Sequence, residues 1–212
     1  MGFTLIRVPF FLEPDYPESE DFEETNRVRL HRKWGSEEGF EAQKKRHGLK
    51  ERGEAVGIPR FDLDRIASST MASHRLVQWV TRTLGINAAE SLYADLNSLH
   101  FERGRKLNDR EMLVGAAERV GADAGAARAF LESDEGREQI AAAQGLLGRM
   151  GVSGIPTLLL GGKWALPSGA IGADAIVSAF RELEAQGGAT ASFFGDVLGI
   201  PERVMDETLA LE

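Results

Sequence analysis

The chain has 212 residues, which allow one domain or a domain with a large insertion, and its 42% hydrophobic and 27% charged residues are ordinary for a globular protein. The net charge of -8 argues against nucleic acid as a partner, and no apolar run approaches the ~20 residues that a membrane helix needs. The sequence contains no cysteine, so its residues form no disulfide, thiolate nucleophile or cysteine-ligated zinc site, which fits a cytoplasmic protein.

An N-terminal strand and a long helical region follow from the apolar pattern. Residues 3–12 alternate and then run apolar, which predicts a strand, whereas residues 20–56 are charged and helix-compatible, with Gly35, Gly39, Gly48 and Gly53 as breaks. From Ser68 the apolar residues recur at helical spacing. We predict five helices: one capped by Ser69 or Thr70 and ending at Gly85, one from about Ala88 to Arg103, one opened by Asp109, one after Gly121-Ala122-Asp123, and one capped by Ser133-Asp134 that runs to Met150.

A hairpin, a helix and a tail make up the rest of the chain. Residues 157–160 are apolar on both faces and predict a buried strand, joined by a turn at Gly161-Gly162 to a second strand at 163–166. A helix is expected from about Ala173 to Gln186, and the apolar tail is expected to form a short helix docked on the body or on a partner chain. This order predicts an α/β fold with an all-helical insertion. The expected divisions are residues 1–66, 67–150, 151–187 and 188–212.

The run from Gly151 to Thr157 carries the strongest local signal. Gly151 and Gly154 supply turn conformations that other residues resist, and Pro156 stands at the entrance of the buried strand. An X-Pro bond is the one peptide bond that readily adopts cis, and with a cis bond the backbone of Ile155 would turn outward and could pair with an extended ligand. A tight turn before a strand explains the local sequence equally well.

Several separated segments resemble the DsbA-like thioredoxin-fold proteins. This group includes FrnE-type oxidoreductases, 2-hydroxychromene-2-carboxylate isomerases and kappa-class glutathione transferases. The segments are residues 69–79 (Ser-Thr-Met-Ala-Ser-His-Arg-Leu-Val-Gln-Trp), Val8 to Pro14, the cis-proline-like run Gly151 to Pro156, and the closing hairpin Gly162 to Ala170. The resemblance covers about residues 3–185 and implies a thioredoxin-like sheet with a large all-helical insertion.

The chain also departs from the pattern of that family. Its members begin with a strand and a helix that carry either Cys-x-x-Cys or a catalytic serine. This chain starts at what resembles the second strand, so the resemblance implies an incomplete sheet without the active-site unit. The gap would be filled by rearrangement, by the tail at 188–212 or by another subunit, unless the sequence is a truncated gene model. The family's asparagine before the threonine is Ser69 here.

Candidate site residues lie at the proline loop and at the start of the helical block. Gly154, Ile155 and Pro156 are expected to bind substrate. Ser69 and Thr70 are expected to cap a helix, and their hydroxyls could bind a ligand carboxylate at its positive end. Arg75 could clamp such a carboxylate, or could pair with Asp62, Asp64 or another acid. His74 is a weak candidate for a catalytic base, and a structural histidine is favoured.

No metal site is predicted. His31, His47 and His100 lie in polar stretches and are expected to be exposed, and no pairing of histidines or of glutamate with histidine has the spacing of a metal motif. Glutathione is the one cofactor that the resemblance makes a candidate.

Two functions remain open. The first is a glutathione-dependent isomerase or transferase, in which glutathione brings the reacting sulfur because this chain has none. The second, which we favour, is a non-catalytic binding or assembly relative of the FrnE-type oxidoreductases. Expected partners are a small thiol or peptide-like ligand, or another protein, and a homo-oligomer is expected. Neither nucleic acid nor a membrane is an expected partner.

Overall fold

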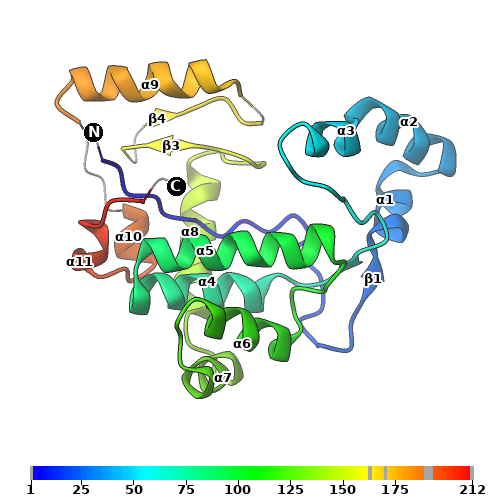
Figure 1. Cartoon of the computed structure of the whole chain (residues 1–212), viewed down its shortest axis with the longest axis horizontal. Coiled ribbons are helices and arrows are strands. Elements are labelled where there is room, and N and C mark those ends of the chain that lie inside the picture. The colour runs from blue at the N-terminus through cyan, green and yellow to red at the C-terminus, as the bar shows by residue number, and fades with distance from the viewer. Residues whose placement is uncertain (1, 162–163, 170, 189–192, 211–212) are drawn as a thin grey trace. The chain divides into compact units, whose positions relative to one another are not determined.

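The computed structural model describes residues 2–161, 164–169, 171–188 and 193–210. The chain falls into two units, which we treat one at a time (Figure 1). Unit 1 comprises Met1–Leu12, Gln78–Ala89 and Asp134–Glu212, and unit 2 comprises Glu13–Val77 and Glu90–Ser133. The described part is mostly helical, and its strands form two separate antiparallel pairs. No helix in that part is long and apolar enough to cross a membrane.

Unit 2 begins with a short strand and three helices. The elements are β1 (Glu24–Thr25), α1 (Asn26–Trp34), α2 (Glu37–His47), α3 (Leu49–Glu54) and β2 (Ile66–Ala67). The Thr25 hydroxyl caps α1 by accepting from the Val28 N–H, and Gly35 and Gly48 end α1 and α2 with positive φ angles of 80° and 51°. The breaks predicted at Gly35 and Gly48 are therefore confirmed, whereas Gly39 and Gly53 lie inside helices.

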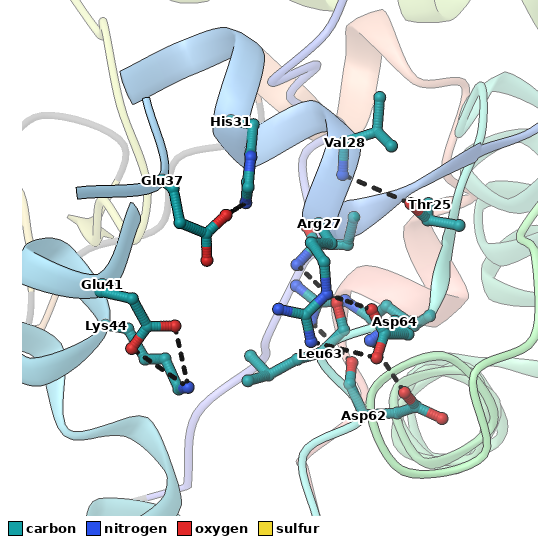
Figure 2. Close-up of polar contacts among 12 residues, drawn as sticks. Thr25, Arg27, Val28, His31, Glu37, Glu41, Lys44, Asp62, Leu63 and Asp64 are labelled. Carbon is teal, nitrogen blue, oxygen red and sulfur yellow. Dashed lines mark hydrogen bonds and ion pairs between the residues drawn. The ribbon is translucent and has the colours of Figure 1, made fainter. Parts of the chain in front are cut away.

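β2 and the residues just before it contact β1 and α1 through a strand pairing and an ion pair. Glu24 pairs with Ala67 and Thr25 with Ile66 in the β1–β2 ladder, a pairing that the sequence did not predict. Arg27 on α1 donates from Nε to Asp64 Oδ1 at 2.7 Å and from Nη2 to Asp64 Oδ2 at 3.2 Å (Figure 2). These contacts join residues that are 37 positions apart in the sequence.

The helical block of the sequence prediction is present. It contains α4 (Met71–Leu84), α5 (Ile86–Asn97), a π-helix (Ser98–Glu102), α6 (Arg110–Arg119) and α7 (Ala124–Glu132). The predicted start of the third helix at Asp109 is confirmed, because its carboxylate accepts from the Met112 N–H at 2.9 Å, and Asp123 at the predicted break caps the fourth helix by accepting from the Ala126 N–H at 2.7 Å. The second helix is shorter than expected, since the backbone changes at Ser98 to the wider π-turn.

Unit 1 contains α8 (Arg137–Arg149), β3 (Leu159–Leu160), β4 (Trp164–Ala165), α9 (Ala173–Ala185), α10 (Phe193–Val197) and α11 (Glu202–Met205). The predicted hairpin is confirmed, with Leu159 opposite Ala165, and α9 lies along it (Figure 1). The predicted cap of α8 at Ser133-Asp134 is wrong. Gly136, with a φ of 85°, precedes the helix, and the Asp134 carboxylate pairs with the Arg137 guanidinium at 2.9 Å instead.

The strand predicted at residues 3–12 is absent, because described residues 3–10 pair with no ladder. Glutamine side chains from two helices hold this segment instead. Gln78 of α4 donates to the Arg7 carbonyl at 2.6 Å, and Gln144 of α8 donates to the Pro9 carbonyl. The apolar pattern that suggested a strand serves another purpose, since Ile6, Val8 and Phe10 pack on the core of unit 1.

The apolar tail forms two short helices that complete this core. Leu198 and Val204 are fully buried, and Phe194 and Ile200 are 7% exposed, all packed in one cluster with Ile86, Ala143 and Leu147. Within unit 1 the tail is therefore docked on its own chain, which was one of the two outcomes expected from the sequence. Because its described residues are helical or irregular, they supply no strand to a sheet.

Candidate functional site

The proline loop of unit 1 leads from α8 into β3. Gly151 leaves the helix with a φ of 73°, and the Ile155–Pro156 peptide bond is cis, as the motif allowed. The Thr157 hydroxyl donates to the Gly154 carbonyl at 2.7 Å and lies 3.0 Å from the Ser168 hydroxyl, while the Gly169 N–H donates to the Pro156 carbonyl at 2.9 Å. These bonds fix both ends of the loop around Ile155.

Ile155 lies in the middle of this loop and is half-exposed. None of the hydrogen bonds among the described residues engages its N–H or its carbonyl. Unpaired backbone groups held at a fixed position can pair with an extended chain, since each supplies one donor and one acceptor. The closing hairpin of the sequence motif is described only in part, because Gly162, Lys163 and Ala170 lie outside the described residues.

The start of α4 in unit 2 holds the other predicted binding residues. Ser69 is 7% exposed, and its hydroxyl accepts from the Met71 N–H at 3.3 Å, which confirms it as a cap. The Thr70 carbonyl accepts from the Ser73 hydroxyl at 3.0 Å and from the His74 N–H at 2.9 Å. These residues therefore build the first turn of the helix, and their role toward a ligand stays a prediction.

Arg75 of α4 is used to hold another helix in place. It is 2% exposed, and its guanidinium donates to the main-chain carbonyls of Phe130 at 2.9 Å, Ser133 at 2.6 Å and Leu131 at 3.4 Å. These carbonyls lie at the C-terminal end of α7, where a cation also offsets the helix dipole. The expected ion pair of Arg75 with Asp62 or Asp64 is wrong, because these acids pair with Arg60 and Arg27.

The predicted binding residues fall into two groups. Gly154, Ile155 and Pro156 belong to unit 1, whereas Ser69, Thr70, His74 and Arg75 belong to unit 2. Each group is ordered by contacts inside its own unit, and we assign no site that joins them.

A pocket of about 520 Å³ in unit 2 was not predicted from the sequence. It is lined by Glu13, Asp15, Tyr16, Pro17, Phe22, Glu24 and Arg32. The Tyr16 hydroxyl donates to Glu24 Oε2, and Arg32 Nη2 donates to the same oxygen at 3.1 Å and to the Tyr16 oxygen at 3.3 Å. The acidic run around Glu24 and the basic face of α1 were the available signals, but neither shows from sequence alone that they meet.

This pocket keeps its tyrosine neutral. Burial, followed by the hydrogen bond to Glu24 and the charge of Glu24, raises the pKa of Tyr16 to about 12. Burial alone would raise the pKa of Glu24, but the hydrogen bonds from Arg32 and Tyr16 outweigh it, and the pKa is lowered. The three side chains are hydrogen-bonded to one another, so none of them is a base ready to accept a proton.

Histidines and acids do not gather into a metal centre in the part of the chain that is described, where no group of three or more potential ligands is placed to hold an ion. Two of the histidines expected to be exposed are partly buried: His31, whose ring lies 4.8 Å from that of Phe40, and His100. His100 lies in the π-helix, where its Nδ1 contacts the Arg105 carbonyl at 2.9 Å and its Nε2 accepts from Arg65.

Comparisons with known proteins agree with this structure. The family described as "DSBA-like thioredoxin domain" matches residues 4–181. The crystal structure of a probable DsbA oxidoreductase from Streptomyces coelicolor superposes with a TM-score of 0.72 at 26% sequence identity, over 86% of this chain and 75% of that one. Comparison with the curated proteins found no match. The predicted fold class, a thioredoxin-like α/β fold with a helical insertion, is thereby confirmed.

Proposed function

The chain belongs to the DSBA-like thioredoxin domain family, and from this premise we propose that it is a non-catalytic binding or assembly relative of that family's oxidoreductases. The observation that carries the proposal is the absence of cysteine from all 212 residues. Thiol–disulfide exchange proceeds through attack by a thiolate, so no residue of this chain can perform it. The chain retains the proline loop and the unit whose hydrogen bonds hold that loop in place.

We assign the binding role to the loop from Gly154 to Pro156. Ile155 is half-exposed, its backbone makes no hydrogen bond among the described residues, and Thr157 and Gly169 make bonds that hold the loop around it; together these support pairing with an extended peptide-like ligand. Such pairing needs no sulfur in the protein. A loop that is already ordered loses little conformational freedom on binding, which favours affinity.

Two small probes test this role. Reduced glutathione is an extended tripeptide, and S-methylglutathione has the same backbone without a free thiol. If the loop recognises the backbone, both raise the thermal midpoint in a saturable way. A ligand at 100 times its dissociation constant stabilises by about 2.7 kcal/mol, or about 5–10 °C for a chain of this size.

Two variants connect a shift of the midpoint to the loop. Ile155→Pro removes the backbone N–H of this position and should abolish the shift, whereas Ile155→Ala keeps the N–H and should preserve it. Near-ultraviolet circular dichroism confirms that both variants fold. If neither probe shifts the wild-type midpoint at 10 mM, the loop is not a site for peptide-like ligands, and the binding role must be sought elsewhere.

A glutathione-dependent isomerase or transferase is the second candidate. It is favoured by the same absence of cysteine, because the reacting sulfur would then have to come from the ligand. The two probes separate the candidates. Binding of reduced glutathione without binding of S-methylglutathione, together with turnover of an electrophilic substrate, supports the enzyme, whereas equal binding and no turnover supports the binding module.

Self-association or capture of a partner protein belongs to the same proposal. The buried tail helices are part of the core of unit 1, so an interface would use other surfaces. Sedimentation velocity at tens of micromolar tests this part. A compact monomer would argue against a homo-oligomer and leave only a heterologous partner.

A further inference from the structure

Arg65 of unit 2 is held firmly but makes no contact with a carboxylate. It precedes β2 and is partly buried. Its Nε donates to His100 Nε2 at 3.3 Å, and its Nη1 donates to the main-chain carbonyl of Asp62 at 3.1 Å. Its guanidinium carbon lies 4.9 Å from the centre of the Phe101 ring. The charge of Asp62 attracts Arg65, but no carboxylate oxygen bonds the guanidinium directly, and a partly desolvated charge without such a bond is costly.

The acids of this region are engaged by other arginines. Among the described residues, no carboxylate oxygen lies within the 4.0 Å of an ion pair from Arg65. The pairs are Asp62 with Arg60 at 3.2 Å, Asp64 with Arg27 at 2.7 Å and Glu13 with Arg29 at 2.7 Å. Figure 2 shows that the Asp62 carboxylate also accepts from the Asp64 N–H. Asp62 therefore bonds Arg65 through its carbonyl alone, and its carboxylate attracts Arg65 without a direct bond.

The electrostatics of this cluster are those of an excess positive charge. Burial, and then repulsion by Arg29, lowers the pKa of Arg65 to about 10, although the charge of Asp62 opposes this shift. Burial is also the main cause that lowers the pKa of His100 to about 4, with further repulsion from Arg65 and Arg29, although the hydrogen bond to the Arg105 carbonyl opposes it. An anion placed beside Arg65 would relieve both repulsions.

We propose that Arg65 and His100 form a binding site for a carboxylate. A guanidinium carries five donors in a planar fork, and the two bonds described above leave three of them for a ligand. The π-helix places His100 and Phe101 against this fork, so the ring nitrogen and the aromatic face fix its direction. The site takes a planar oxyanion, and it is independent of the function proposed for the proline loop.

Protonation of His100 should strengthen this site. In the neutral ring, Nδ1 donates to the Arg105 carbonyl, so Nε2 is the acceptor for Arg65. A bound carboxylate favours the imidazolium, whose Nε2 no longer accepts from Arg65 Nε and instead donates to the ligand, which also accepts from the guanidinium. An opposite charge at this range raises a histidine pKa by about 1–3.

The test follows the His100 ring by NMR in the full chain. Sodium trifluoroacetate, a carboxylate that stays ionised at low pH, is titrated at constant ionic strength against sodium perchlorate. We expect saturable broadening of the ¹⁹F signal and a rise of the His100 pKa from about 4 to about 5 or higher. Perchlorate alone should leave the His100 pKa unchanged.

Matched variants identify the residue responsible. Arg65→Met should abolish both responses, whereas Arg46→Met, which removes an exposed arginine of α2 that contacts neither Arg65 nor Asp62, should preserve them. The proposal is overturned if the His100 pKa does not move, if perchlorate moves it equally, or if Arg65→Met retains the full response. Should Arg65→Met fail to fold, His100→Gln with the ¹⁹F readout replaces it, and unchanged affinity there removes His100 from the site.

Discussion

The docking of the tail on unit 1 can be measured through Leu198. This side chain is fully buried between α10 and α11, in the cluster formed with Ile86, Leu147 and Val204. Leu198→Ala removes apolar atoms and leaves a cavity, which costs about 2–5 kcal/mol for a buried leucine. With a urea m-value of about 3 kcal/mol/M, a loss of about 3 kcal/mol lowers the unfolding midpoint by about 1 M.

The control lies on the neighbouring helix. Phe193 of α10 is 44% exposed, so Phe193→Ala should cost less than about 1 kcal/mol. Urea titrations of both variants at two protein concentrations complete the experiment. A loss below about 1 kcal/mol for Leu198→Ala, or a loss that depends on protein concentration, would refute docking on the same chain and place the tail on a partner.

Three further predictions concern unit 2. Arg75→Lys should lower the free energy of unfolding by about 2–4 kcal/mol in urea titrations, because a compact ammonium does not reproduce the planar fork whose two terminal nitrogens bond the three carbonyls at the end of α7, and an unchanged stability would contradict this role. Since the pKa of His100 is about 4 in the fold against about 6.5 unfolded, the unfolded state binds more protons between these values. Stability should therefore be complete above pH 6.5 and fall by about 2–3 kcal/mol toward pH 4, and this slope should flatten in His100→Gln. In absorbance titrations at 295 nm, a tyrosine ionising near pH 12 should vanish in Tyr16→Phe; if it persists, Tyr16 is not the residue held neutral.

Local signals in the sequence were enough to predict the helical block. The caps at Asp109 and Asp123 act on an N–H three residues ahead, so a short window contains both partners of the bond. The hairpin is similar, because a tight turn brings two neighbouring apolar runs together. The N-terminal segment shows where such reasoning fails. Its alternating apolar residues fit a strand, but its partners are the side chains of Gln78 and Gln144, far along the chain.

The family resemblance was enough to predict the proline loop. The charged clusters of unit 2 match no family motif, so the sequence did not predict them. Tyr16 meets Arg32 across 16 positions and Arg65 meets His100 across 35, and neither pair belongs to a recognisable motif. Arg75 illustrates the same limit, since its sequence neighbourhood suggested an acid or a ligand, while its partners are carbonyls 55 to 58 positions away.

Three arginines of unit 2 differ in the groups that accept their hydrogen bonds, and this difference indicates what each of them can do. Arg75 donates to three main-chain carbonyls at the C-terminal end of α7, so its role is to hold this helix in place. Arg32 donates to the Glu24 carboxylate and to the Tyr16 oxygen, so its hydrogen bonds are made within the pocket wall. Arg65 is bonded to a histidine and to one carbonyl, and among the described residues no carboxylate bonds it directly, although the charge of Asp62 attracts it. Because desolvated charges in proteins are normally paired and hydrogen-bonded, Arg65 is the arginine for which we propose an external anion.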